Sequence, residues 1–213
     1  MKRRYYGLLI IFLFFLSLAS CGTRNQPGSP GSDGDTGVIM SNTIIPLYNG
    51  VNTNDIDAVQ DLCPDGKAEP FFRHQATFTI SVLLERPDLN ILPANVYIDE
   101  YTIDYVRSSD SAGAPPIEQY REFVTITPLM PAVGATSASI TPAFTGMLMD
   151  IPRKLKYASD MTSGQFTSEM GSVAILNNYT AVYTFYGKND FGQSFKIVVS
   201  VPFVIGDFDN CGA

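Results

Sequence analysis

Strict alternation of apolar and polar residues near the C-terminus constrains the fold of this chain more than any other feature. The apolar positions occur at every second residue: Phe195, Ile197, Val199, Val201, Phe203 and Ile205. A period of two places such residues on one face of a β-strand, with that face buried and the other wet. Residues 179–186 alternate in the same way, and the turn-rich segment 187–192 joins the two runs. Together they predict an antiparallel hairpin.

Shorter β-branched and aromatic runs predict more strands upstream. These are residues 43–48, 78–84, 97–105, 123–126, 140–151 (as one strand or two) and 155–157. One helical turn is expected at 55–62, and no longer helix. Pro202, which has no N–H for a ladder, predicts an edge or a bulge. About seven or eight strands with Gly, Pro and Ser turns predict an all-β fold, an antiparallel β-sandwich formed by a single domain, residues 38–213.

The segment before the C-terminal hairpin is Leu176-Asn177-Asn178-Tyr179-Thr180-Ala181-Val182-Tyr183. It resembles the corner-and-strand pattern of immunoglobulin-like and fibronectin-III-like domains. The resemblance implies that Tyr179 is a corner tyrosine whose hydroxyl is bonded back to the preceding loop. The chain lacks the family's buried Trp and a Cys pair spaced like an inter-sheet bridge. The likeness covers about 30 residues, and it implies an architecture without an active site.

The N-terminus has the order of elements of a bacterial lipoprotein signal peptide. Basic residues 2–4 precede an apolar run from Leu8 to Leu18, and Leu18-Ala19-Ser20-Cys21 resembles a lipobox, the recognition motif of signal peptidase II. The alternative is an uncleaved anchor, but the run is shorter than the roughly 20 apolar residues of a membrane span. We expect residues 1–20 to be removed and Cys21 to carry diacylglycerol, with acyl chains such as palmitate.

Residues 21–37 predict a flexible tether, because the segment after Cys21 is polar and rich in Gly, Ser and Pro. Gly22 is not the Asp that, by resemblance to enteric lipoproteins, retains a protein at the inner membrane. The outer membrane is therefore the expected address, on either its periplasmic or its outer side. The chain has a net charge of −7 and the leader removes three basic residues and no acid, so the mature chain carries −10. This charge argues against nucleic acid as a partner and leaves the lipid as the contact with the membrane.

Two cysteines remain after the lipobox, Cys63 and Cys211. In an oxidising compartment two cysteines most often pair, so a disulfide is expected. A metal or redox site is the alternative, but the chain has neither a CxxC spacing nor a histidine near either cysteine.

Several acidic residues could carry chemistry. The first group is Asp99, Glu100, Asp104, Glu118 and Glu122. Two of these could act as a glycosidase acid and base across a cleft. Glu100 and Asp104 share a strand face that the alternation places in solvent, which favours a charged surface instead. Asp207, Asp209 and Asn210 are candidate calcium ligands, with residues 55–61 as a second source, although acidic surface loops are the simpler interpretation.

The single histidine, His74, lies just before a predicted strand. The chain has no Gly-x-Ser-x-Gly motif and no set of zinc ligands around it, which favours a polar residue at the start of a strand. One strand face is expected to carry Tyr97, Tyr101 and Tyr105. These tyrosines could form an exposed ladder that binds sugar, but packing in the core is favoured. Core packing is likewise favoured over a soft-metal site for the methionines Met147, Met149, Met161 and Met170.

The sequence therefore predicts a non-catalytic envelope lipoprotein, without a cofactor, that acts as a structural or protein-interaction module. A partner would be an envelope protein, bound through the loops 108–118, 128–137 and 159–172 or through the edge near Pro202. The first alternative is a module that binds a glycan or another small ligand, which an exposed tyrosine groove would mark. The second is an unrecognised hydrolase, which a cleft with two carboxylates would mark.

Overall fold

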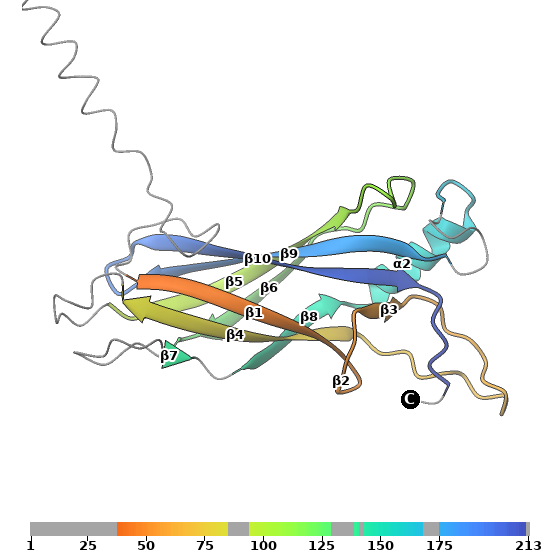
Figure 1. Cartoon of the computed structure of the whole chain (residues 1–213), viewed down its shortest axis with the longest axis horizontal. Helices are drawn as coiled ribbons and strands as arrows, with labels where there is room; N and C mark the ends of the chain where they lie inside the picture. Colours follow the sequence, from red (N-terminus) through yellow and green to blue (C-terminus); the bar gives the residue numbers. More distant parts are fainter. Residues whose placement is uncertain (1–37, 85–93, 129–138, 141–142, 168–174, 212–213) are drawn as a thin grey trace, which may run out of the picture.

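Two β-sheets packed against each other form the body of the protein (Figure 1). The computed structural model describes residues 38–84, 94–128, 139–140, 143–167 and 175–211. Within these residues there are ten strands and one helix, and each sheet has five strands. The expectation of a mostly β, two-sheet fold is confirmed. The expected signal peptide, Cys21 and the tether lie outside the described residues.

The first sheet is organised around β4. Its strands are β1 (Val38–Tyr48), β2 (Val51–Asn52), β4 (His74–Leu84), β7 (Ser139–Ile140) and β8 (Phe144–Met149). β4 pairs with β1 on one side, and with β7 and β8 at different points of its other side. Asn49 and Gly50 join β1 to β2 with φ values of 47° and 82°, as the centre of a type I′ hairpin turn requires.

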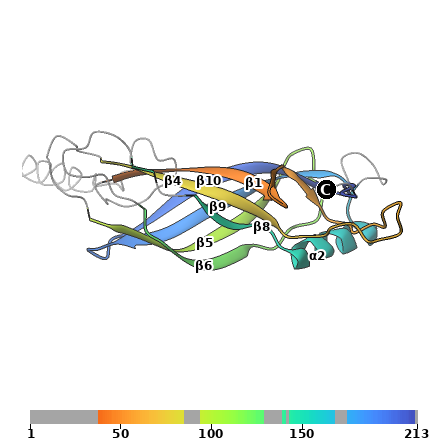
Figure 2. The same cartoon turned by 90° about the horizontal axis from the view of Figure 1, so that it is seen from below.

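The second sheet has the order β3-β10-β9-β5-β6. Its strands are β3 (Asp55–Asp57), β5 (Val96–Arg107), β6 (Tyr120–Ile126), β9 (Asn177–Asn189) and β10 (Ser194–Gly206). The predicted C-terminal hairpin is confirmed, with Phe195 opposite Gly187 and Ile205 opposite Asn177. Figure 2 shows β6 next to β5 at one edge of this sheet.

Two details of the predicted architecture are wrong. The first is the helical turn at 55–62: residues 55–57 form β3 instead, because the chain crosses to the second sheet after β2 and runs alongside β10. The second is the purely antiparallel order, since β3 pairs with β10 in parallel. β3 covers only the last three residues of β10, opposite Val204 to Gly206. Pro202 therefore lies at an edge among the described strands, as expected.

The strand predicted at 155–157 and the expected absence of a longer helix are also wrong, because these residues belong to α2 (Ile151–Thr162). Asp150 caps the helix by accepting the Arg153 N–H at 3.1 Å. The buried residues of α2 are Lys154, Tyr157 and Met161, whose spacing of three and four places them on one helical face. The three-residue segment Leu155-Lys156-Tyr157 is too short to distinguish the helical period from that of a strand.

Aromatic side chains fill the space between the sheets. Phe78 of β4 is fully buried, and its ring centroid lies 5.0 Å from that of Tyr183, 5.3 Å from that of Phe185 and 6.1 Å from that of Tyr101. The inward positions of the C-terminal alternation, from Phe195 to Ile205, supply much of the remaining core. Much of the core between the sheets is therefore aromatic.

The sandwich has two different ends (Figure 1). The start of β1 and the β9–β10 hairpin lie at one end, here called the tether end because residue 38 follows the predicted tether. β3, α2 and the C-terminus lie at the other, here called the distal end. Strands of thirteen residues such as β9 and β10 separate the two ends by about 40 Å. Within the described residues no helix is long and apolar enough to cross a membrane.

Candidate functional site

A β-bulge in β5 rearranges the residues that the sequence proposed as a tyrosine ladder. The register shifts between Ile98 and Glu100, both against β6 and against β9. One inserted residue makes the side chains before and after it point to opposite faces. Tyr101 is buried in the core, Tyr105 is half-buried there, and Tyr97 lies on the outer face between buried neighbours. Core packing is therefore confirmed for Tyr101, while the expectation that Tyr97 shares its face is wrong.

The bulge brings two consecutive carboxylates to the outer face of the second sheet. Asp99 is exposed and its carboxylate lies 3.4 Å from the Lys188 ammonium. Glu100 accepts a hydrogen bond of 2.6 Å from the Arg121 guanidinium. Asp104, further along the strand, is exposed as expected. Each acid of the bulge thus has its own cation, which differs from the acid-base pair of a glycosidase, where two carboxyl groups act on one bond.

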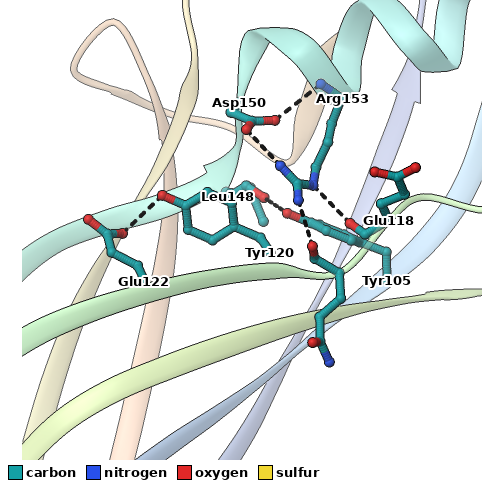
Figure 3. Close-up of polar contacts among 8 residues, drawn as sticks. Tyr105, Glu118, Tyr120, Glu122, Leu148, Asp150 and Arg153 are labelled. Atoms are coloured by element: carbon teal, nitrogen blue, oxygen red, sulfur yellow. Dashed lines mark hydrogen bonds and ion pairs between the residues drawn. The ribbon is translucent and has the colours of Figure 1, made fainter.

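Inside the sandwich, a carboxylate of the edge strand β6 lies among tyrosines. Glu122 is opposite Tyr101, whose hydroxyl donates to it. The hydroxyl of Tyr120 donates to the same oxygen at 3.2 Å (Figure 3). Burial, followed by the charge of Glu122, raises the pKa of Tyr120 to about 12. Burial raises the pKa of Tyr101 further, so both phenols keep their protons and act as donors.

Next to these tyrosines, Arg153 of α2 fastens the helix to the start of β6. Its guanidinium forms an ion pair of 2.7 Å with Asp150 and donates to the carbonyl oxygens of Glu118 at 2.8 Å and Gln119 at 2.5 Å (Figure 3). It also lies 5.2 Å above the ring of Tyr120. Arg153 therefore joins α2 to the residues just before β6 through two hydrogen bonds to carbonyl oxygens.

A third polar group is buried at the distal end, and the sequence missed two of its members. Asp57, Glu69, His74 and Lys154 are each at most 2% exposed. The Lys154 ammonium donates to the carbonyl oxygen of Phe72 at 2.9 Å. His74 is the first residue of β4, as expected, but it is fully buried. The spacing of Lys154 relative to apolar Tyr157 and Met161 was the available signal for its burial, but a Lys at such a position is normally placed in solvent.

Burial governs the ionisation of this group. It lowers the pKa of Lys154 to about 8, although the charges of Asp57 and Glu69 oppose the change. It raises the pKa of Asp57 to about 6, against the hydrogen bonds that the carboxylate accepts from the backbone of Phe208 and Val59. It lowers the pKa of His74 to about 3, and the charge of Lys154 adds to this effect. The histidine is therefore neutral in the folded protein at physiological pH.

The same buried group holds the C-terminal segment. The carboxylate of Glu69 accepts the backbone N–H groups of Asp61 at 3.0 Å and of Asn210 at 2.9 Å. Next to it the expected disulfide is present, with the Cα atoms of Cys63 and Cys211 5.4 Å apart. The loop before β4 and the residues after β10 are thus joined covalently and through a buried carboxylate.

The calcium candidates lie in this region, where the side chains of Asp209 and Asn210 bond to the neighbouring backbone. Asp209 accepts the backbone N–H of Cys211 at 2.9 Å, and the side-chain amide of Asn210 donates to Phe208 at 3.2 Å. Burial, and then the charge of Asp61, raises the pKa of Asp207, as expected if residues 55–61 lie close to it. Coordinating groups of Glu69, Asp209 and Cys211 lie within 4.8 Å of one another, but the sulfur belongs to the disulfide.

Tyr179 does not form the predicted corner. Its hydroxyl donates to the carbonyl oxygen of Pro115, in the loop after β5, and not to the loop that precedes β9. The side chain is buried, and its ring stacks on Phe203 with 5.7 Å between the centroids. Packing of β9 against the β5–β6 loop therefore decides the partner of this hydroxyl.

A shallow hollow of about 300 Å³ lies on the outer side of the distal end. Its lining includes Ser108 and Asp110 from the loop after β5, Asn54 before β3, and Pro202 and Val204 of β10. The sequence proposed the 108–118 loop and the edge near Pro202 as separate binding surfaces. The structure places them side by side.

Of the methionines, Met149 and Met161 are buried in the core, as expected, and Met147 is partly buried against it. Met170 and the proposed loop 128–137, apart from Pro128, lie outside the described residues, as does part of the loop 159–172.

The chain matches no protein-family model and no curated protein. Among solved structures it is similar to one titled "X-ray structure of Northeast Structural Genomics Consortium target SoR45". The two are 7% identical, the match covers 81% of this chain and 88% of the other, and the TM-score is 0.32. A likeness at that level carries no argument about the function of this chain.

Proposed function

We propose that this protein is a lipid-anchored, non-catalytic module of the bacterial cell envelope that binds a protein partner at its distal end. The ordered leader and the lipobox at Cys21 support the anchor. The outer membrane is the favoured address, because Gly22 follows the cysteine. With lipid at the N-terminus, the tether end is the end joined to the membrane, and the distal end is the end farther along the chain from the lipid.

We further propose that the sandwich is of the immunoglobulin-like type. The strand order supports this: in chain order, β4, β5, β8, β9 and β10 correspond to the family's strands B, C, E, F and G. Their pairings agree, with β4 beside β8, and β9 between β5 and β10. β6 corresponds to the additional strand that variable-type domains carry beside C. The absent Trp and the different partner of Tyr179 are departures from the family.

The observation that carries the binding proposal is the hollow where the loop after β5 meets the edge at Pro202. Polar groups of Asn54, Ser108 and Asp110 lie beside apolar Pro202. Such a mixture suits a protein surface, on which hydrogen bonds and apolar contacts alternate. Loops on a rigid sandwich are the usual place for binding residues.

The loop that forms one wall of the hollow is held in place before any partner arrives. Arg107 donates to the carbonyl oxygen of Ala114 at 2.8 Å, and the backbone N–H of Asn178 donates to the Ser111 hydroxyl at 2.7 Å. The hydroxyl of Tyr179 donates to the same loop at Pro115. A loop that is already ordered loses less conformational entropy on binding, which favours affinity.

Crosslinking in intact cells tests the proposal. A photoreactive amino acid at Asn54, which lines the hollow, should form a crosslink to one reproducible envelope protein. The same group at Phe191, which is 81% exposed at the tether end, is the matched control and should not. Asp110→Arg should lower the yield from Asn54 by at least tenfold, because it places a long cation in the hollow.

Two outcomes would contradict this function. One is an equal crosslinking pattern from Asn54 and Phe191, or none from Asn54 in cells where Cys21 is lipidated. The other is turnover of a substrate by the purified protein that is lost in Glu100→Gln or Asp104→Asn, which would favour the hydrolase.

A further inference from the structure

The outer face of the second sheet, around the bulge in β5, carries two exposed aromatic rings. Phe123 of β6 is 73% exposed and Tyr186 of β9 is 42% exposed. Both lie directly opposite Glu100, one on each side of β5. Neighbouring strands are about 4.8 Å apart, so the backbones of the two aromatic residues are about 10 Å apart, with the carboxylate between them.

Hydrogen-bonding groups fill the space between the rings. The Arg121 guanidinium donates to Glu100 at 2.6 Å and lies 5.0 Å above the ring of Phe123. Asp99, brought outward by the bulge, pairs with Lys188 at 3.4 Å. These two carboxylates and two cations cancel in charge, while each retains sites for further hydrogen bonds. We call Phe123, Tyr186, Glu100 and Arg121 the aromatic row.

We propose that the aromatic row is a binding site for a segment of an uncharged oligosaccharide. A pyranose ring has an apolar face of C–H groups and a rim of hydroxyls, so it needs an aromatic surface below and both donors and acceptors at its edge. Directly linked pyranoses lie closer together than the about 10 Å between these two backbones, so the two aromatic rings suit the first and third sugars of a linked chain. The balanced charges favour a neutral ligand over an anionic or cationic one.

The dimensions argue for a sugar over a protein at this place. A stable protein interface buries about 800 Å² on each partner, with a contiguous aromatic and apolar centre. Here the exposed apolar surface is limited to two rings, with an ion pair between them. The aromatic row is distinct from the hollow at the distal end, so failure of either proposal leaves the other standing.

Titration calorimetry on the mature, detergent-solubilised protein tests this site. Cellotriose and N,N′,N″-triacetylchitotriose serve as probes, with sorbitol as the control solute. We expect at least one probe to bind saturably with a millimolar Kd. Phe123→Ala and Tyr186→Ala should each weaken binding at least tenfold, whereas Tyr186→Phe, which keeps the ring, should weaken it less.

Val106→Ala is the matched control, because Val106 is also an exposed apolar residue of β5, at 51%. It should bind the probes as the parent protein does. Thermal melting verifies that each variant is folded, as expected for exposed side chains. Absence of binding by both trisaccharides at about ten times a millimolar Kd would overturn the proposal. Equal affinity of the parent and Phe123→Ala would overturn it as well.

Discussion

Acid is expected to destabilise this fold chiefly through a single imidazole. His74 is buried, its Nε2 lies 2.9 Å from the carbonyl oxygen of Asp55, and its Nδ1 has no partner among the described residues. Burial lowers its pKa from 6.5 to about 3. Between these pH values the unfolded chain binds more protons than the folded chain, so the free energy of unfolding falls as the pH is lowered. At about 1.4 kcal/mol for each pKa unit, this effect amounts to about 5 kcal/mol.

A carboxyl in the same buried group has the opposite effect. Burial raises the pKa of Asp57 from 3.8 to about 6. Between these values the folded chain binds more protons, so the free energy of unfolding rises as the pH is lowered, by about 3 kcal/mol in total. The two slopes overlap and largely cancel between pH 6 and 4. The parent protein should therefore lose stability steeply only between about pH 4 and 3.

Two variants separate these contributions. His74→Gln removes the imidazole, so its free energy of unfolding should increase as the pH falls from 6 to 4. Asp57→Asn removes the carboxyl, so its free energy of unfolding should decrease continuously below pH 6.5. Gln75→Ala, a neighbouring half-buried change, is the control and should give a profile parallel to that of the parent.

Urea unfolding at closely spaced pH values, with the disulfide intact, gives the three profiles. Because the chain has one histidine, an NMR titration follows the same group directly. The reasoning is refuted if the imidazole of the folded protein titrates near pH 6.5. Parallel profiles for His74→Gln and the parent would refute it too.

Three further predictions concern the covalent features and one buried hydroxyl. Cys21→Ala should abolish metabolic lipid labelling and leave an unprocessed precursor, and an intact mass with another mature N-terminus would contradict the lipobox. Replacing Cys63 and Cys211 by Ser should lower the free energy of unfolding by up to about 5 kcal/mol in the chain-entropy model, since 148 residues separate them. Urea unfolding midpoints measure this loss, and an unchanged midpoint would contradict the prediction. Tyr179→Phe leaves the Pro115 carbonyl without its donor, so the free energy of unfolding in urea should fall by about 1–3 kcal/mol. An unchanged free energy of unfolding would show that the bond contributes nothing.

The parts of the fold that the sequence predicts are those in which one local pattern decides the outcome. In the C-terminal hairpin, a period of two assigns Phe195 and Ile205 to the core, and the turn between the strands sets their register. The pairing of Cys63 with Cys211 followed from their number in an oxidising compartment. Neither prediction required knowledge of what lies on the neighbouring strands.

The bulge in β5 shows why the tyrosine ladder could not be placed in the same way. Tyr97 and Tyr101 are four residues apart, which a regular strand would put on one face. The single residue inserted at Asp99 reverses that relation, and it becomes recognisable only from the pairing with β6 and β9. The aromatic row is likewise recognisable only from strand pairing. Phe123 and Tyr186 are more than sixty residues apart in the chain, and the pairing places them on either side of Glu100 in β5.

At the distal end, charged groups occupy positions that a pattern of apolar residues assigns to the core. Lys154 lies on the buried face of α2, and Glu69 is buried beside the disulfide. A buried charge is costly unless partners are fixed around it. Here the partners are the carbonyl oxygen of Phe72 for the ammonium and two backbone N–H groups for the carboxylate. These contacts form only when the loop before β4, α2 and the C-terminal residues are all in place. The polar interior of the distal end therefore couples the order of three separate segments.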